Sequence, residues 1–164
     1  MTSADRDILL RRLDDTRSKI EEYLPNIDAR KEIYPGWTIK EMLAHMTGWD
    51  EATIDSLRAH VIGRPPSVPA IHSMDEYNAL TVSSRKGLNY DQTLKEWRLT
   101  RQVLRTTIEQ MPEDKFIGLI IVPWGDKATV TYLVDMFRDH EDEHARDISK
   151  WLQNPEKPLE KEGS

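Results

Sequence analysis

Two histidines near the C-terminal end of the chain, His140 and His144, have a type and spacing that suit metal binding. A helix predicted from about Thr129 or Thr131 to Leu152 places both imidazoles on one face, one above the other. The same face carries Leu133, Met136, Phe137, Ile148 and Trp151. Imidazoles on an inward-facing apolar stripe need partners for both ring nitrogens, and a metal ion is one such partner. The pair therefore indicates a metal site inside the fold.

A third histidine, His45, lies on the apolar side of a second predicted helix, between Met42 and Trp49. Helical bundles bring inward-facing side chains of different helices together. Three neutral imidazoles with open positions for water or substrate suit a divalent ion, namely Zn, Ni, Fe or Mn. The alternative is three core or half-exposed histidines with ordinary hydrogen-bond partners. His60 and His72 lie outside this arrangement and are interpreted as a helix-end residue and a loop residue.

The segment from His140 to His144 also matches the pattern H-E-x-x-H, in which the glutamate of zinc proteases acts as a general base. A protease is disfavoured, because none of the 20 residues after His144 supplies a third ligand. Glu141 lies about 80° around the helix from the axis of the two histidines. We therefore predict Glu141 as a catalytic base that reaches a water at the metal, with an ordinary acidic surface residue as the alternative.

Three further charged residues fall on apolar faces. Asp147 shares the face of His144 and is interpreted as an acceptor that orients this ligand or as a salt-bridge partner. Asp50 lies on the apolar side of the second helix, where a charge needs a partner. Arg101 occupies a stripe position between Trp97 and Leu104 on another helix. A buried polar pair of Asp50 and Arg101 is the favoured interpretation.

Four long amphipathic patterns must position these residues. They are expected at about 4–24, after Trp37 to about 61, from about 89 to 111 and up to 152. A shorter helix is expected between Ser73 and Gly87. Polar pairs that cap helix starts support three of these boundaries: Thr38 with Glu41, Ser73 with Glu76, and Asn89 with Gln92.

An apolar stretch rich in β-branched residues, between Phe116 and Thr131, predicts a short hairpin or an ordered loop. The fold class is therefore all-α, a four-helix bundle with a short extra helix and this loop or hairpin before the last helix. An up-down order is favoured, although the long connection after residue 61 leaves the topology open. Residues 1–153 are expected to form one domain, and 154–164 a flexible C-terminal tail.

The overall composition excludes several functions. The net charge is -6, and basic residues are interspersed with acidic ones, so nucleic acid is not an expected partner. No apolar run approaches the length of a membrane helix, and the polar N-terminus does not resemble a signal peptide. The chain has no cysteine, which excludes thiolate zinc sites and cysteine nucleophiles. A cytoplasmic protein without membrane contact is the expectation.

The segment from Trp37 to Trp49 resembles the second-helix signature of the DinB-like superfamily, in which a tryptophan precedes the helix and its histidine is the first metal ligand. The run from His140 to Ile148 resembles that superfamily's last-helix pair, although Glu143 and Asp147 depart from the commoner pattern. The ClbS/DfsB branch of four-helix-bundle proteins is similar in the placement of further residues, namely Tyr77, Asn78, Trp97, Pro123, Trp124 and Gly125. The resemblance spans nearly the whole chain.

This resemblance implies a four-helix bundle with an unusual connection, one divalent metal ion on His45, His140 and His144, and a homodimer. Relatives include thiol transferases and isomerases that use glutathione, mycothiol or bacillithiol. The ClbS branch includes self-resistance proteins that hydrolyse a strained cyclopropane in a genotoxic natural product.

Three functional hypotheses follow. The first is a metal-dependent hydrolase or thiol transferase that acts on a small electrophile, in detoxification or self-resistance. The second is a non-catalytic stress-response protein that sequesters a small-molecule ligand. The third is a structural bundle without metal.

Overall fold

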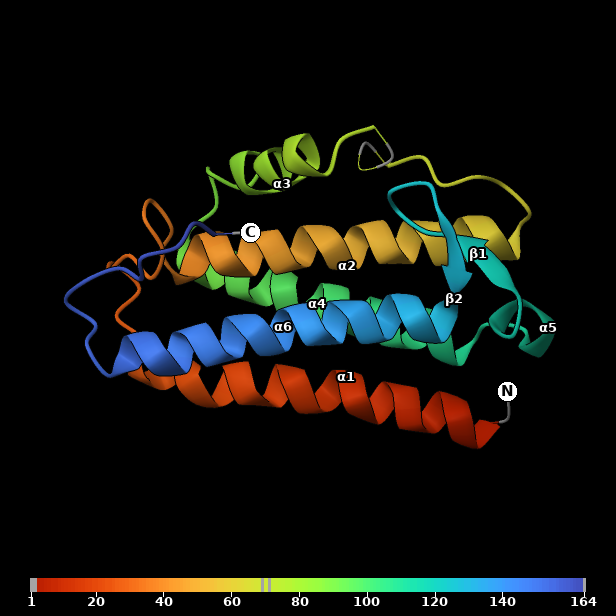
Figure 1. Ribbon diagram of the computed structural model, residues 1–164, viewed down its shortest axis with the longest axis horizontal. Coiled ribbons are helices and arrows are strands. Elements are labelled where there is room, and N and C mark those ends of the chain that lie inside the picture. Colours follow the sequence, from red (N-terminus) through yellow and green to blue (C-terminus); the bar gives the residue numbers. More distant parts are fainter. Residues whose placement is uncertain (1–2, 69, 71, 164) are drawn as a thin grey trace.

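A bundle of four long helices dominates the computed structural model, which describes residues 3–68, 70 and 72–163 (Figure 1). The four are α1 (Ser3–Tyr23), α2 (Ile39–Val61), α4 (Tyr90–Glu109) and α6 (Val130–Leu152). This confirms the all-α fold class and the four helices expected from the hydrophobic pattern. Among the described helices, none combines the length and the apolar character that a membrane span requires.

The helices begin where the capping residues predict. Asn89 and Gln92 each accept a hydrogen bond from the other's backbone N–H, at 2.8 and 2.9 Å, and α4 starts directly after Asn89. The Thr129 hydroxyl accepts from the backbone N–H of Tyr132 at 3.1 Å, which selects Thr129 rather than Thr131 as the start of the last helix. These side chains satisfy N–H groups that have no partner within the helix.

The directions of the helices differ from a simple up-down order. In Figure 1, α2 and α4 run the same way along the bundle, whereas α1 and α6 run the opposite way. The connection between α2 and α4 carries α3 (Met74–Ser83) and returns the chain to the end at which α2 began. This connection is long enough to travel back along the bundle, so the two helices can lie parallel. α1 packs along α6, and α2 along α4.

Smaller elements lie at the two ends of the bundle. The turn η1 (Leu24–Asn26), which contains Pro25, ends the first helical segment. At the other end, α5 (Glu113–Phe116) precedes two short antiparallel strands, β1 (Leu119–Ile121) and β2 (Lys127–Thr129). The structure thus selects a hairpin over an irregular loop. Its turn includes Gly125 at φ 98°, a conformation that glycine adopts without steric cost.

The apolar core is divided into two clusters along the bundle axis. One contains Leu9, Leu57, Leu104 and Leu133, and the other contains Ile20, Leu43, Trp97 and Ile148, so that each draws on all four long helices. On α1, α4 and α6 a buried charged residue lies between the two clusters in sequence, namely Arg17, Arg101 and Glu141. On α2 the buried Asp50 directly follows Trp49, at the edge of the first cluster. The interior therefore contains a charged layer between two apolar ones.

The segment after α6 turns back along the bundle, and the C-terminal end lies near the start of α2 (Figure 1). The backbone N–H of Leu159 donates to the carbonyl oxygen of Ile33 at 2.7 Å. The sequence predicted a flexible tail here because the segment is charged and contains two prolines. In the structure, residues 154–163 make specific contacts with the bundle, which depend on partners far away in the sequence.

Replacement of Gly48 by alanine is expected to destabilise the protein by about 1–3 kcal/mol, because α3 lies too close for a side chain. A Cβ at position 48 would come within 2.3 Å of Thr81 Cγ2 and 2.5 Å of Thr81 Cβ. The overlap exceeds the helix-propensity gain of about 1 kcal/mol for alanine over glycine. Denaturant unfolding of Gly48→Ala should be compared with Gly87→Ala, where a Cβ meets nothing within 4 Å. Equal stability of the two variants would contradict this packing.

Candidate metal centre

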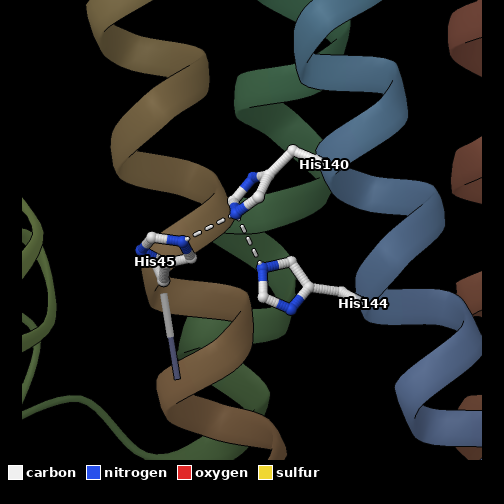
Figure 2. A group of neighbouring side chains, drawn as sticks. All are labelled: His45, His140 and His144. Carbon is white, nitrogen blue, oxygen red and sulfur yellow. Dashed lines mark hydrogen bonds between the residues drawn. The ribbon is translucent and has the colours of Figure 1, made fainter. Parts of the chain in front are cut away.

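The three predicted histidines meet inside the bundle. Figure 2 shows His45 projecting from α2 toward His140 and His144, which project from successive turns of α6. The Nε2 atom of His140 lies 3.4 Å from Nε2 of His45 and 3.0 Å from Nε2 of His144. His45 and His144 are buried, and His140 is half-buried. The structure thus brings together residues from two distant parts of the chain.

The spacing of these nitrogens fits a shared ion. Ligand nitrogens at about 2.0–2.1 Å from a tetrahedral zinc ion are about 3.3–3.4 Å from one another. One ring nitrogen carries a single in-plane proton or lone pair, so His140 Nε2 cannot form a good hydrogen bond with both neighbours at once. A cation placed among the three would instead use one lone pair from each ring. The ligand atoms all lie within 4.8 Å of one another, so the three histidines could hold one metal ion.

Tyr34 sets the tautomer of His144. Its Oη lies 2.9 Å from His144 Nδ1 and donates a hydrogen bond to Asp147 Oδ2 at 2.5 Å. Burial, followed by the hydrogen bond to Asp147, raises the pKa of Tyr34, so the phenol keeps its proton. Because that single proton goes to Asp147, the tyrosine oxygen accepts from His144 Nδ1–H. The lone pair of His144 therefore lies on Nε2, which faces the other two histidines.

Asp147 is thus linked to His144 through Tyr34 and does not contact it directly. The sequence predicted Asp147 either as an acceptor that orients His144 or as a salt-bridge partner. The structure shows the salt bridge, with Lys161 Nζ 2.7 Å from Asp147 Oδ2, and places Tyr34 between Asp147 and His144. Sequence reasoning missed Tyr34 because it lies in an irregular loop. The short isolated bridge between Tyr34 and Trp37 positions it, and no local pattern signals such a contact.

A pocket adjoins the histidines on the side of α3 and the hairpin. It has a volume of about 290 Å³ and is lined by His45, His140, Trp49, Met74, Asn78, Trp124, Met136 and Phe137. The wall is thus mostly apolar. The Trp49 indole donates to Asn78 Oδ1 at 2.6 Å, and this bond fixes the amide at the pocket wall. An ion on the histidines would border this pocket through His45 and His140.

Glu141 does not lie with the histidines. It is buried, and its Oε1 accepts from Arg17 at 2.8 Å and also from Arg101, while its Oε2 accepts from Thr16 at 2.8 Å. Burial by itself raises the pKa of a carboxyl group, but Arg101 and Arg17 outweigh it and lower the pKa of Glu141 to about 2. A carboxylate occupied by two guanidinium groups is poorly suited to act as a base. This geometry argues against the catalytic role predicted for Glu141.

The same charged layer contains the predicted pair of Asp50 and Arg101. Arg101 donates from Nε to Asp50 Oδ2 at 3.0 Å and from Nη2 to Oδ1 at 3.1 Å. Arg17 joins it through a 3.0 Å bond to Asp50, and its guanidinium stacks over the ring of Trp97 at 3.9 Å. The predicted buried pair is confirmed, and it belongs to a larger network of two cations and two anions that links all four long helices.

The remaining two histidines lie elsewhere, as the sequence predicted. His60 is near the C-terminal end of α2, with Nε2 at 2.9 Å from the carbonyl oxygen of Lys115. His72 is exposed and precedes α3. Neither is among the described residues that form the metal-ligand group.

Comparison with known proteins identifies the family. The family model of the mycothiol maleylpyruvate isomerase N-terminal domain matches residues 7–148, which include all three histidines. Domains of this family are DinB-like helical domains that often bind metal, which agrees with the superfamily predicted from the sequence. The search of curated proteins found no match, and neither did the search of solved structures. The chain therefore belongs to the mycothiol maleylpyruvate isomerase N-terminal domain family.

Proposed function

We propose that the protein binds one divalent metal ion with His45, His140 and His144 and acts on a small, uncharged electrophile in the adjoining pocket. The observation that carries the proposal is the convergence of three Nε2 atoms beside a mostly apolar pocket, which His45 and His140 line. Zn, Ni, Fe and Mn all suit a set of three neutral imidazoles. A bound ion would act as a Lewis acid and lower the pKa of a water or thiol nucleophile.

The pocket supports the choice of an uncharged substrate. Of the described residues that line it, none is Lys, Arg, Asp or Glu. Its volume lies at the lower end of the range for small-molecule sites, about 300–1,000 Å³. Trp49, Trp124 and Phe137 would cover an apolar body, while the amide nitrogen of Asn78 can donate to an acceptor on the ligand. This donor would orient the molecule relative to His140.

The reaction would be hydrolysis or addition of a thiol to the electrophile. No residue of the pocket wall in the described chain, apart from the histidines, can exchange a proton near neutral pH. The same observation favours a second candidate, a non-catalytic protein that sequesters its ligand, because a site without an acid or base can bind without turnover. A role in detoxification or self-resistance, a cytoplasmic location and a homodimer, which the resemblance to the ClbS/DfsB branch implies, stay predictions.

A test uses protein purified without an affinity tag. Metal-loaded protein should convert an uncharged epoxide such as styrene oxide, with water or with an added low-molecular-weight thiol, to more than one product per chain. The rate should fall at least tenfold after the metal is removed by a chelator and recover when it is restored.

The control variant is His72→Ala, since His72 is exposed and outside the site. It should keep the wild-type rate. Product formation that stops at one molecule per chain would favour sequestration over catalysis. A rate that is unchanged by metal removal would contradict the proposed chemistry.

A further inference from the structure

The C-terminal segment carries a lysine that contacts two acids on the helix of His140 and His144. We propose that Lys161 is a positioning residue for the ligand His144, acting through Asp147 and Tyr34. This inference rests on the proposed metal site and adds to it a residue outside the region that the family model matches, which ends at residue 148.

The segment is held against the loop that contains Tyr34. Besides the bond from Leu159 to Ile33, Glu156 pairs with Lys31. Gly163 lies so close to Trp37 that a Cβ there would come within 2.4 Å of the indole. Trp37 in turn packs on His45, with ring centroids 5.3 Å apart. The segment therefore covers the same end of the site from which Tyr34 approaches His144.

Lys161 reaches two acids on α6. Its Nζ lies 2.7 Å from Asp147 Oδ2 and 3.0 Å from Glu143 Oε1. The ammonium group is also 5.8 Å from the centre of the Tyr34 ring. Glu143 and Asp147 are the two positions at which the sequence departs from the commoner last-helix pattern, and the structure shows that one lysine bridges both.

The contacts form one directed chain of hydrogen bonds. Lys161 and Tyr34 both donate to the same oxygen of Asp147, and His144 donates to Tyr34 through Nδ1. Two donors on one oxygen hold the carboxylate in the rotamer that receives the tyrosine proton. The tyrosine oxygen then presents its lone pair to His144, which orients the ring and keeps the Nε2 lone pair toward the metal position.

A surface salt bridge is the simpler explanation for Lys161. Exposed ion pairs contribute about 0–1 kcal/mol to stability and have no specific effect on a site. The two explanations differ in what they change. A salt bridge would affect the stability of the apo protein alone, whereas a positioning residue would affect metal affinity and ligand geometry at nearly constant stability.

The experiment measures Zn²⁺ affinity by competition with a chromophoric chelator and the visible absorption of the Co²⁺-substituted protein. Untagged protein with all 164 residues is used at one pH. Tyr34→Phe should weaken Zn²⁺ binding by about 10–100-fold, the range for partners that orient a metal-ligating histidine. Lys161→Gln should weaken it by about 3–10-fold, since Lys161 lies two steps further from His144 than Tyr34 does. Lys161→Arg should restore most of the affinity, and Lys161→Gln should shift the Co²⁺ bands.

The matched control is Lys157→Gln, an exposed lysine on the same segment. It should keep wild-type affinity and the wild-type Co²⁺ spectrum, and the melting temperature of all apo lysine variants should stay close to that of the wild type. If Lys161→Gln binds Zn²⁺ as tightly as Lys157→Gln, or arginine fails to restore a loss, the positioning role is wrong while the metal site stands. If wild-type protein binds no Zn²⁺, the metal site and this inference both fail.

Discussion

His140→Ala is expected to abolish stoichiometric metal binding. The variant leaves two of three ligands, so its loss of affinity should exceed the roughly 100-fold that loss of an outer partner can cause. His140 is the best position for the test because it is half-buried and lies between the other two histidines, so its removal disturbs the core least. Elemental analysis of untagged protein gives the metal content directly, and avoids nickel acquired from an affinity column.

The loss of metal binding in His140→Ala can also be checked by measuring thermal stability with and without added metal. A metal that binds only the folded state stabilises it by about 2.7 kcal/mol at a concentration 100 times its Kd. Added Zn²⁺ should therefore raise the melting temperature of the wild type and of His72→Ala, but not that of His140→Ala. A full equivalent of tightly bound metal in His140→Ala would show that the three histidines are not the site.

Glu141→Gln is expected to cost about 3–5 kcal/mol of stability, because it removes one charge from a buried ion-pair network. The variant leaves Arg17 and Arg101 facing Asp50 alone, so two buried cations would share one anion. The matched control is Asp139→Asn, which changes an exposed acid on the same helix and should shift stability by less than about 0.5 kcal/mol. Denaturant unfolding of the apo proteins measures both.

This variant also separates the two roles considered for Glu141. Loss of a general base lowers the reaction rate by about 10²–10⁴-fold and leaves the stability of the protein nearly unchanged. Loss of a member of the charged layer lowers stability instead, while the folded variant keeps its metal affinity. A stable Glu141→Gln protein with a much lower rate would restore the catalytic assignment made from the sequence.

The contribution of the same buried ion-pair network should also appear when stability is measured at decreasing pH. Arg101 and Arg17 hold the pKa of Glu141 at about 2 in the folded protein, below its ordinary value of 4.5. A carboxyl group whose pKa is lower in the folded protein than in the unfolded chain stabilises the fold at pH values above its unfolded pKa. This stabilisation is lost as the pH falls toward the folded-state pKa. The wild type should therefore lose stability between about pH 4.5 and pH 2, and its advantage over Glu141→Gln should shrink in that window. A constant difference between the two proteins across this range would contradict the network.

The position of Glu141 shows the limit of a helical-wheel argument. An offset of about 80° from the two histidines is compatible with reaching the metal. It is equally compatible with turning toward α1, against which α6 packs. Arg17 and Arg101 decide between the two directions, because they draw the Glu141 carboxylate away from the histidines. Of the two arginines, only Arg101 was singled out from the sequence. The choice depends on helices that are distant in the sequence.

The sequence alone determined those features of the structure that depend on interactions between residues close together in the chain. Capping side chains and apolar periodicity act within a few residues, so helix boundaries such as those at Ser73 and Asn89 could be predicted. The inward placement of His45, His140 and His144 followed from the same periodicity. Tertiary structure alone decided that Tyr34 contacts His144, that Lys161 returns to Asp147, and that α2 and α4 run parallel. These features depend on distances between helices and on loop paths, which packing of the whole chain sets and no short stretch of sequence encodes.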